Sequence, residues 1–296
     1  MSDFVRQNGT EAAFTASDSW VILSPIEQSI KRKIEAVGVP LKDWDIQINY
    51  GIKTGFNDAF IISTEKRNEI LANCADDDER HRTEELIRPI LRGRDIKRYG
   101  YDWADLWLIN THNGIKGKLE RIHIEDYPAV KVHLDQYWDK LSKRTDKGDT
   151  PYNLRNCAYL DDFNKPKIVW GEISDRSKFA FDKDGCFVPE ATTFLLVGKN
   201  IIGLYAFLNS SLAEWYFSKL GPRTGEGTIR WKKYTVEQIF APKFDGCFIH
   251  QIINILSDVT MDTATLMNQL FYDFYQLNDE EIQCVKEYFT AMAKKK

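Results

Sequence analysis

The sequence lacks closely paired cysteines: its five cysteines are widely spaced and never form C-x-x-C. Structural zinc sites and disulfide frameworks both depend on such pairs, so the sequence predicts neither. An odd number of scattered thiols is typical of proteins that are kept reduced in the cytoplasm.

Long hydrophobic runs are also missing, since no apolar stretch approaches the roughly 18–20 residues that span a bilayer. The N-terminal residues MSDFVRQNGTEAAF lack the charged-then-apolar layout of a secretory signal peptide. They read as an abrupt beginning, as if the natural polypeptide continued upstream. We therefore expect a cytoplasmic protein without a membrane partner.

An excess of positive charge is the third absence. The 40 Lys and Arg residues face 44 Asp and Glu residues, which gives a formal net charge of −4. Proteins that bind nucleic acid without sequence preference are usually basic. A nucleic-acid function would therefore require the cations to be concentrated on one face. The length of 296 residues and the hydrophobic share of 43% allow a large buried core, in one domain or two.

Complete catalytic motifs are missing as well. Without a Pro-Pro dipeptide, the chain cannot contain the Asn-Pro-Pro-aromatic motif with which adenine methyltransferases hold a flipped base. No histidines have metal-ligand spacing, and no G-x-S-x-G elbow occurs. Asp95-Ile96-Lys97 formally fits the Asp/Glu-x-Lys of magnesium nucleases, which keeps a metal-dependent DNA endonuclease as an alternative. Otherwise we expect no catalytic, cofactor or metal site in this segment.

Residues 50–62, YGIKTGFNDAFII, join two strand-like segments through a polar turn with two glycines. Glycine reaches positive φ without strain, so the pattern predicts a hairpin whose tip presents Lys53, Thr54 and Asn57. A cation, a hydroxyl and an amide can bond to phosphate oxygens or to base edges. The alternative is an ordinary hairpin whose polar tip faces water.

Residues 87–99, IRPILRGRDIKRY, gather five cations against one acid in a chain that is acidic overall. Such a cluster creates a local positive field, and arginine can grip a phosphate or a guanine edge with two bonds. The candidate DNA contacts in this stretch are Arg92, Arg94, Lys97 and Arg98. The alternative is a solvated face paired with the acidic residues 76–79.

Residues 222–233, PRTGEGTIRWKK, form a second basic stretch with four cations, one acid and a tryptophan. Its glycines would let the backbone approach a DNA groove closely. The candidate contacts in this stretch are Arg223, Thr224, Arg230, Trp231, Lys232 and Lys233. A glycine-rich nucleotide-binding loop is disfavoured, because such a loop follows a strand and opens a helix.

Local patterns predict the main elements of an α+β fold with a mostly antiparallel sheet. Ser24 and Glu27 form a capping box around Pro25, which predicts a helix start, and Gly38 predicts the end of that helix. Strands are predicted at 167–173, 178–181 and 192–197, and helices at 83–91 and 200–220.

The last fifty residues differ in composition from the rest. An apolar helical stripe covers 248–275, and a last helix follows from 278, which together predict a C-terminal helical hairpin. We therefore expect a recognition domain of residues 1–245 and a packing or assembly element of residues 246–296.

Segments in order along nearly the whole chain resemble the TaqI-like C-terminal specificity domain of type II, mostly type IIG, restriction–modification adenine methyltransferases. The similarity lies in WVILSPIEQSIKRKIEAVG (20–38), GIKTGFNDAFII (51–62), IRPILRGRDIKRY (87–99), YNLRNCAYLDDFNKPKIVWGEI (152–173), LNSSLAEWYF (208–217), residues 230–243 and LMNQLFYDFYQLNDEEI (266–282).

This resemblance implies that the chain reads a short sequence in double-stranded DNA for an upstream methyltransferase domain of the same polypeptide. S-adenosylmethionine would then be the cofactor of the parent enzyme and not of this segment. The expected phosphate contacts are Lys97, Arg98, Lys232 and Lys233. The expected base contacts are Lys53, Thr54, Asn57, Arg92, Arg94, Arg223 and Arg230.

Besides the endonuclease, a protein-interaction module that uses the C-terminal helices and ignores DNA remains a further alternative. In the DNA-reading hypothesis, these helices would pack on the methyltransferase part or on another copy of the chain. The sequence leaves the oligomeric state open.

Overall fold

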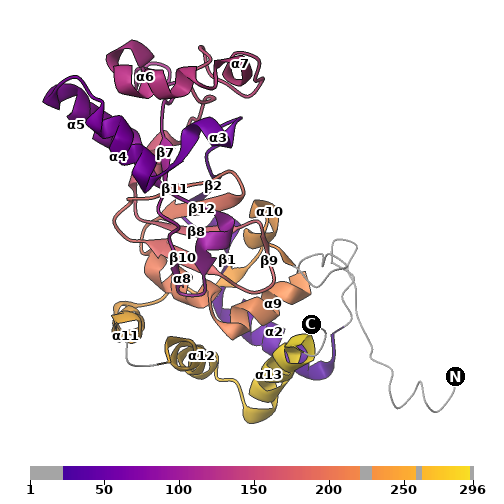
Figure 1. Ribbon diagram of the computed structural model, residues 1–296. Coiled ribbons are helices and arrows are strands. Elements are labelled where there is room, and N and C mark those ends of the chain that lie inside the picture. Colours follow the sequence, from indigo (N-terminus) through magenta and orange to yellow (C-terminus); the bar gives the residue numbers. More distant parts are fainter. Residues whose placement is uncertain (1–22, 221–228, 258–261, 294–296) are drawn as a thin grey trace, which may run out of the picture. The chain divides into compact units, whose positions relative to one another are not determined.

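The computed structural model describes residues 23–220, 229–257 and 262–293 (Figure 1). The chain divides into two compact units, each assembled from separate stretches of sequence. Unit 1 comprises residues 1–46, 173–177 and 199–296, and unit 2 comprises residues 47–172 and 178–198. Both units combine helices with short strands that pair mostly antiparallel, which confirms the predicted α+β class.

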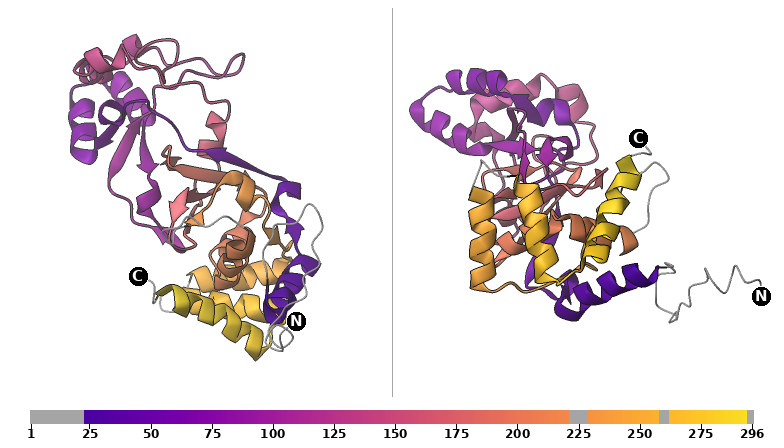
Figure 2. Two further views of the ribbon diagram at one scale, coloured as in Figure 1. Left: turned by 90° about the vertical axis from the view of Figure 1, so that its right-hand side faces the viewer. Right: turned by 90° about the horizontal axis from the view of Figure 1, so that it is seen from below.

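Unit 1 is mainly helical. Its helices are α2 (Pro25–Val37), η1 (Leu41–Asp43), α8 (Ile201–Leu208), α9 (Ser211–Leu220), α10 (Lys233–Val236), α11 (Gly246–Ser257), α12 (Thr263–Phe274) and α13 (Asp279–Ala293). Its short antiparallel ladders pair β1 (Val39–Pro40) with β14 (Phe240–Ala241), and β9 (Ile173–Ser174) with β13 (Ile229–Arg230). Helices α11 and α12 pack side by side, as Figure 2 shows.

Helix α2 begins where the capping box predicts. The Glu27 amide donates to Ser24 Oγ at 3.3 Å, and the Ser24 amide donates to Glu27 Oε2 at 2.8 Å. The helix packs against α13, where Ser29 Oγ and Lys33 Nζ both donate to the buried Glu281 carboxylate at 2.7 Å. This polar contact joins the first described helix of unit 1 to its last.

The predicted helix at 200–220 is interrupted, and two helices take its place. The Asn209 side chain donates back to Tyr205 O at 3.1 Å, and Ser210 Oγ accepts from the Ala213 amide at 3.1 Å. Both side chains offer the backbone local bonds that compete with a continuous helix, so α8 ends and α9 begins here.

The described part of residues 246–296 forms three helices, and the predicted two-helix hairpin is wrong in this respect. Helix α12 has its own start, since Asp262 Oδ1 accepts from the Thr265 amide at 3.2 Å. Its Phe271 ring lies 5.4 Å from that of Phe207 on α8, and both side chains are fully buried. These helices therefore contribute to the core of unit 1.

Unit 2 contains two four-stranded sheets. The first has the order β10-β8-β12-β2, from β10 (Phe179–Asp182), β8 (Lys167–Gly171), β12 (Thr193–Gly198) and β2 (Ile46–Tyr50), whose first residue belongs to unit 1. The second has the order β11-β4-β7-β3, from β11 (Val188–Pro189), β4 (Ile87–Leu91), β7 (Leu106–Ile109) and β3 (Ile61–Ser63). The strands predicted at 167–173, 178–181 and 192–197 are therefore confirmed as β8, β10 and β12 of the first sheet, with β8 and β12 at its centre and β8 ending at Gly171.

The remaining elements of unit 2 are short. They are α3 (Asn57–Phe60), α4 (Thr64–Ala72), α5 (Asp77–Leu86), η2 (Gly93–Asp95), β5 (Ile96–Lys97), β6 (Gly100–Tyr101), η3 (Ile124–Asp126), α6 (Pro128–Asp135), α7 (Trp138–Leu141) and η4 (Leu160–Asn164). The helix predicted at 83–91 is wrong in its second half, where β4 pairs antiparallel with β7. Buried Ile87, Ile90 and Leu91 fit the period of either element, so the spacing alone did not decide.

No helix of the described ranges combines the length and the hydropathy that a membrane span requires.

Candidate nucleic-acid interface

The polar turn at residues 50–57 is not the tip of a hairpin, which corrects the sequence prediction. Strand β2, before the turn, and strand β3, after it, belong to different sheets, and α3 lies between them. Gly51 is needed because a Cβ there would lie 2.0 Å from Glu190 O. Gly55 adopts φ +70°, and a Cβ there would lie 2.3 Å from Asp146 O. Both glycines therefore allow the turn to pack closely against backbone that is distant in the sequence.

The side chains of this turn have different environments. Thr54 is only 2% exposed, and its hydroxyl donates to Asn57 Oδ1 and accepts from the Phe56 amide. The threonine thus stabilises the turn itself. Lys53 and Asn57 are exposed, and Lys53 makes no hydrogen bond or ion pair with any described residue. These two side chains are the ones that this turn can offer to a ligand.

Arg144 fixes the turn from inside the protein, a role that the sequence did not reveal. Its side chain is 8% exposed, and its guanidinium donates to the carbonyl oxygens of Thr54, Asp146 (3.2 Å), Pro151 (3.0 Å) and Asn153 (2.5 Å). Burial lowers the pKa of Arg144 to about 10, so the cation is still present at neutral pH. One buried cation therefore ties residues 54, 146 and 151–153 together.

Two of the five cations in the basic stretch at 87–99, Arg88 and Arg92, are bonded to other groups of the protein. Arg88 donates to Asn164 Oδ1 and to the carbonyl oxygens of Gly185 and Cys186, at 2.7–3.1 Å. Arg92 forms a two-bond pair with the buried Asp95, at 2.7 and 3.0 Å. These bonds raise the pKa of Arg92. Arg88 therefore joins segments that are distant in the sequence, and Arg92 stabilises its own turn.

Of the other cations of this stretch, Arg94 and Lys97 are exposed and Arg98 is partly exposed. Arg94 is exposed and makes no hydrogen bond or ion pair within the described ranges. Lys97 Nζ lies 3.5 Å from a carboxylate oxygen of Asp102, and both side chains are largely exposed, so this pair is weak. The Arg98 guanidinium lies 5.7 Å from the Tyr99 ring centroid.

The polar turn and the Arg92–Arg94 turn contact the same segment, residues 190–193. The Gly51 amide donates to Thr193 O at 2.9 Å. From the other side, the Glu190 amide donates to Leu91 O at 2.8 Å, and a Cβ on Gly93 would lie 3.4 Å from Thr192 Oγ1. Two of the three predicted contact regions are therefore brought together in unit 2.

The third region, at 222–233, belongs to unit 1, and the predicted contacts Arg223 and Thr224 lie outside the described residues. Arg230 is exposed at the end of β13. Trp231 is 2% exposed and stacks on Phe217, with 3.9 Å between the ring centroids. Its ring therefore belongs to the core. The predicted contacts Lys232 and Lys233 are both partly exposed, and Lys233 Nζ lies 3.7 Å from Glu237 Oε1.

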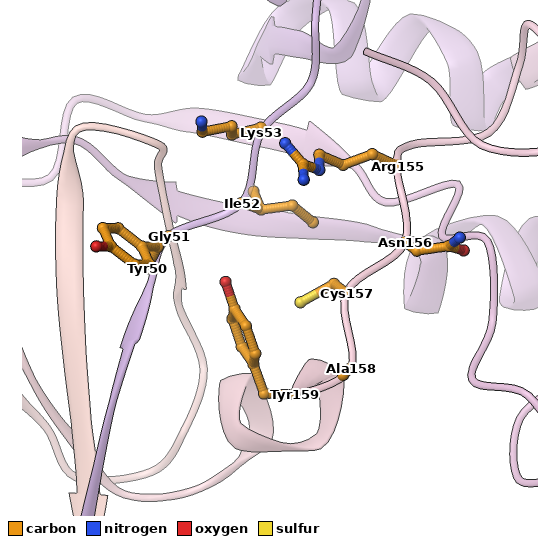
Figure 3. A pocket seen from close by; sticks show the side chains of 9 residues that line it. All are labelled: Tyr50, Gly51, Ile52, Lys53, Arg155, Asn156, Cys157, Ala158 and Tyr159. Atoms are coloured by element: carbon orange, nitrogen blue, oxygen red, sulfur yellow. The ribbon is translucent and has the colours of Figure 1, made fainter.

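A hollow of about 340 Å³ opens beside the polar turn (Figure 3). One wall is the backbone from Tyr50 to Lys53, and the other runs from Arg155 to Tyr159. In Figure 3 the side chains of Ile52, Cys157 and Tyr159 point into the hollow, and Arg155 reaches across its mouth toward the opposite wall. The lining contains two cations and no carboxylate.

The polar groups inside the hollow are neutral at physiological pH. Burial raises the pKa of Tyr159 to about 12, and burial also raises the pKa of the Cys157 thiol. Neither group therefore adds a negative charge that would offset the two cations. Sequence reasoning overlooked Arg155, because a single arginine between uncharged residues forms no basic run.

The nuclease alternative depended on Asp95 as a metal ligand. Both carboxylate oxygens of Asp95 accept bonds from Arg92, including one from the Arg92 amide at 2.9 Å. The Asp95 carboxylate therefore stabilises the Arg92–Asp95 turn. Among the described residues, no group of three or more His, Cys, Asp or Glu side chains could hold a metal ion.

Exposed cations on two turns of a mixed α+β scaffold are what a module that reads DNA for an enzyme would need. The family of TaqI-like C-terminal specificity domains matches residues 88–239, just over half of the chain. The chain belongs to this family, as the sequence resemblance predicted. It is therefore a target-recognition specificity domain of type II restriction–modification methyltransferases.

Relatives of known function agree with this assignment. Type II methyltransferase M.BstVI from Geobacillus stearothermophilus is 21% identical over 282 residues, which cover 93% of this chain and 47% of that protein. The chain thus spans about half the length of this curated relative.

Two solved structures share the fold at 13% identity. The type IIL restriction–modification enzyme MmeI, determined in complex with DNA, has a TM-score of 0.58 over 86% of this chain and 36% of its own. The type IIG restriction endonuclease BpuSI has a TM-score of 0.55 over 89% of this chain and 32% of its own.

Proposed function

We propose that this chain binds double-stranded DNA and reads a short base sequence for a methyltransferase domain of the same polypeptide. The observation that carries the proposal is the meeting of two outward-facing polar turns on residues 190–193, in a chain of the specificity-domain family. S-adenosylmethionine would be the cofactor of the parent enzyme, in keeping with the relation to M.BstVI.

The environments of the predicted contacts sort them into roles. Asn57, Arg94 and Arg230 are exposed, so they are the proposed base-reading side chains, together with Arg223 from outside the described residues. Lys97, Arg98, Lys232 and Lys233 are the proposed phosphate contacts. Buried Thr54 and the Asp95-bound Arg92 would support the contact surface of unit 2, and buried Trp231 would support that of unit 1.

Arg94 offers the sharpest test, because its guanidinium has no partner among the described residues that its removal would leave unsatisfied. The preferred sequence is first selected from randomised duplexes with the unaltered chain at low salt. Arg94→Ala should then lose about 1–3 kcal/mol of discrimination at one base position. Binding to unrelated duplexes should change little.

Lys183→Ala is the matched control, since Lys183 is an exposed cation of the same unit and lies in neither turn. If Arg94→Ala kept both its affinity and its sequence preference, the proposed base-reading role of this turn would be wrong. Failure of the unaltered chain to enrich any sequence would contradict the proposed function as a whole.

A further inference from the structure

The hollow beside the polar turn has the features of a site for an anion. Lys53 and Arg155 stand at its mouth on opposite walls, and none of the nine lining residues is acidic. Lys53 makes no hydrogen bond or ion pair with a described residue. In a chain of net charge −4, two cations on the walls of one hollow form a local concentration of positive charge, although the Lys53 side chain points away from Arg155 in Figure 3.

Arg155 forms an ion pair that orients its side chain and still leaves N–H donors available for a ligand. Its Nη1 lies 3.2 Å from Asp146 Oδ1, and this is its one ion pair among the described residues. The guanidinium carries five N–H donors, so the Nε and Nη2 edge stays available for two parallel bonds to an oxyanion. The Asp146 carboxylate therefore orients Arg155 and leaves its second edge exposed.

The buried Arg144 positions both walls of this mouth. It donates to Thr54 O, directly after Lys53, and to Asp146 O, in the residue that pairs with Arg155. Both bonds come from its Nη1 atom. One buried group thus holds the backbone next to Lys53 and the backbone of the residue that pairs with Arg155, which favours a preorganised site.

We propose that Lys53 and Arg155 together hold a single backbone phosphate of the bound DNA at the mouth of this hollow. The inference rests on the proposed function, and it makes Lys53 a phosphate contact, whereas the sequence resemblance implied a base contact. Tyr159 and Cys157 beneath the mouth are neutral, so they do not repel the phosphate.

The number of phosphates can be counted from the salt dependence of binding. For each phosphate neutralised, the slope of log affinity against log salt steepens by about 0.9. If both cations hold one phosphate, Lys53→Ala/Arg155→Ala should flatten the slope by about 0.9, and the two single losses should not add. Fluorescence anisotropy with a mixed-sequence duplex measures these slopes on the full 296-residue chain.

Two results would overturn the proposal. A flattening of about 1.8 in the double variant would mean two separate phosphates, and an unchanged slope would mean none. Lys183→Ala/Arg80→Ala is the matched control, since both residues are exposed cations of unit 2 that do not line the hollow. If the unaltered chain shows no salt-dependent DNA binding, the proposed function fails, and this inference fails with it.

Alkylation of Cys157 distinguishes DNA phosphate from free phosphate, because its thiol points into the hollow. Bound duplex should slow alkylation of Cys157, as measured by mass spectrometry, while inorganic phosphate at equal ionic strength should not. Cys74 is the internal control, since it is also partly buried, with a raised pKa, in the same unit. Protection of Cys157 by inorganic phosphate alone would assign the site to a free ligand and overturn the DNA assignment.

Discussion

Replacing Arg144 by methionine tests how far one buried cation holds unit 2 together. Methionine keeps much of the side-chain length and removes every donor. Four backbone carbonyl oxygens, of residues 54, 146, 151 and 153, would then lose their bonds to the guanidinium. The change isolates hydrogen bonding from packing, since the aliphatic part of the side chain is largely preserved.

The expected cost follows from these four bonds. A buried acceptor left without a partner costs about 1–3 kcal/mol, but water can reach some of the four carbonyls, and removing a buried cation recovers desolvation. We therefore expect Arg144→Met to lower the free energy of unfolding by about 3–5 kcal/mol. Arg144→Lys should lose less, because an ammonium retains three donors.

Urea unfolding monitored by circular dichroism measures the loss, and amide exchange locates it. Exchange should accelerate at the Phe56 amide, which bonds to Thr54 Oγ1, and at the Gly148 amide, which bonds to Asn153 O. Lys143→Met is the matched control, because it removes the charge of an exposed neighbour. Equal unfolding curves and equal exchange for Arg144→Met and the unaltered chain would refute the reasoning.

Two further predictions concern stability. Deleting residues 246–296 removes α11, α12 and α13 and uncovers Phe207, so it should abolish cooperative unfolding of unit 1; a truncated chain that unfolds like the full one would contradict this packing. Burial lowers the pKa of His133 below 6.5, so the unfolded chain binds its proton more readily and the free energy of unfolding should fall as the pH drops below about 6.5. Urea titrations at about pH 7 and pH 5 should show that the free energy of unfolding falls less in His133→Gln than in the unaltered chain. An equal fall in both would mean that His133 does not cause this pH dependence.

Features that depend on residues close together in the sequence could be predicted from it. The capping box of Ser24 and Glu27 is complete within four residues, and it forms as expected. The strands at 167–173 and 192–197 carry unbroken apolar runs, and both lie in the first sheet of unit 2. Local chemistry was sufficient in these places because no distant partner decides them.

Features that depend on distant partners could not be predicted in this way. Gly51 looked like a turn residue, but its role is to admit the Glu190 carbonyl, which is far away in the sequence. No local pattern marks the role of Arg144, because its four acceptors lie on three separate segments. Arg88 counted toward a positive field, although its bonds run to residues 164, 185 and 186.

The interleaved course of the chain limits how its specificity can be exchanged with that of a relative. Residues 47–198 contain both contact turns of unit 2, so a transplant of those turns would start from this fragment, yet it includes residues 173–177, which belong to unit 1. Within those five residues, Arg176 Nε bonds to the fully buried Glu214 at 2.7 Å, and β9 pairs with β13. A working chimaera should therefore retain the recipient's own residues 173–177 inside the donor fragment.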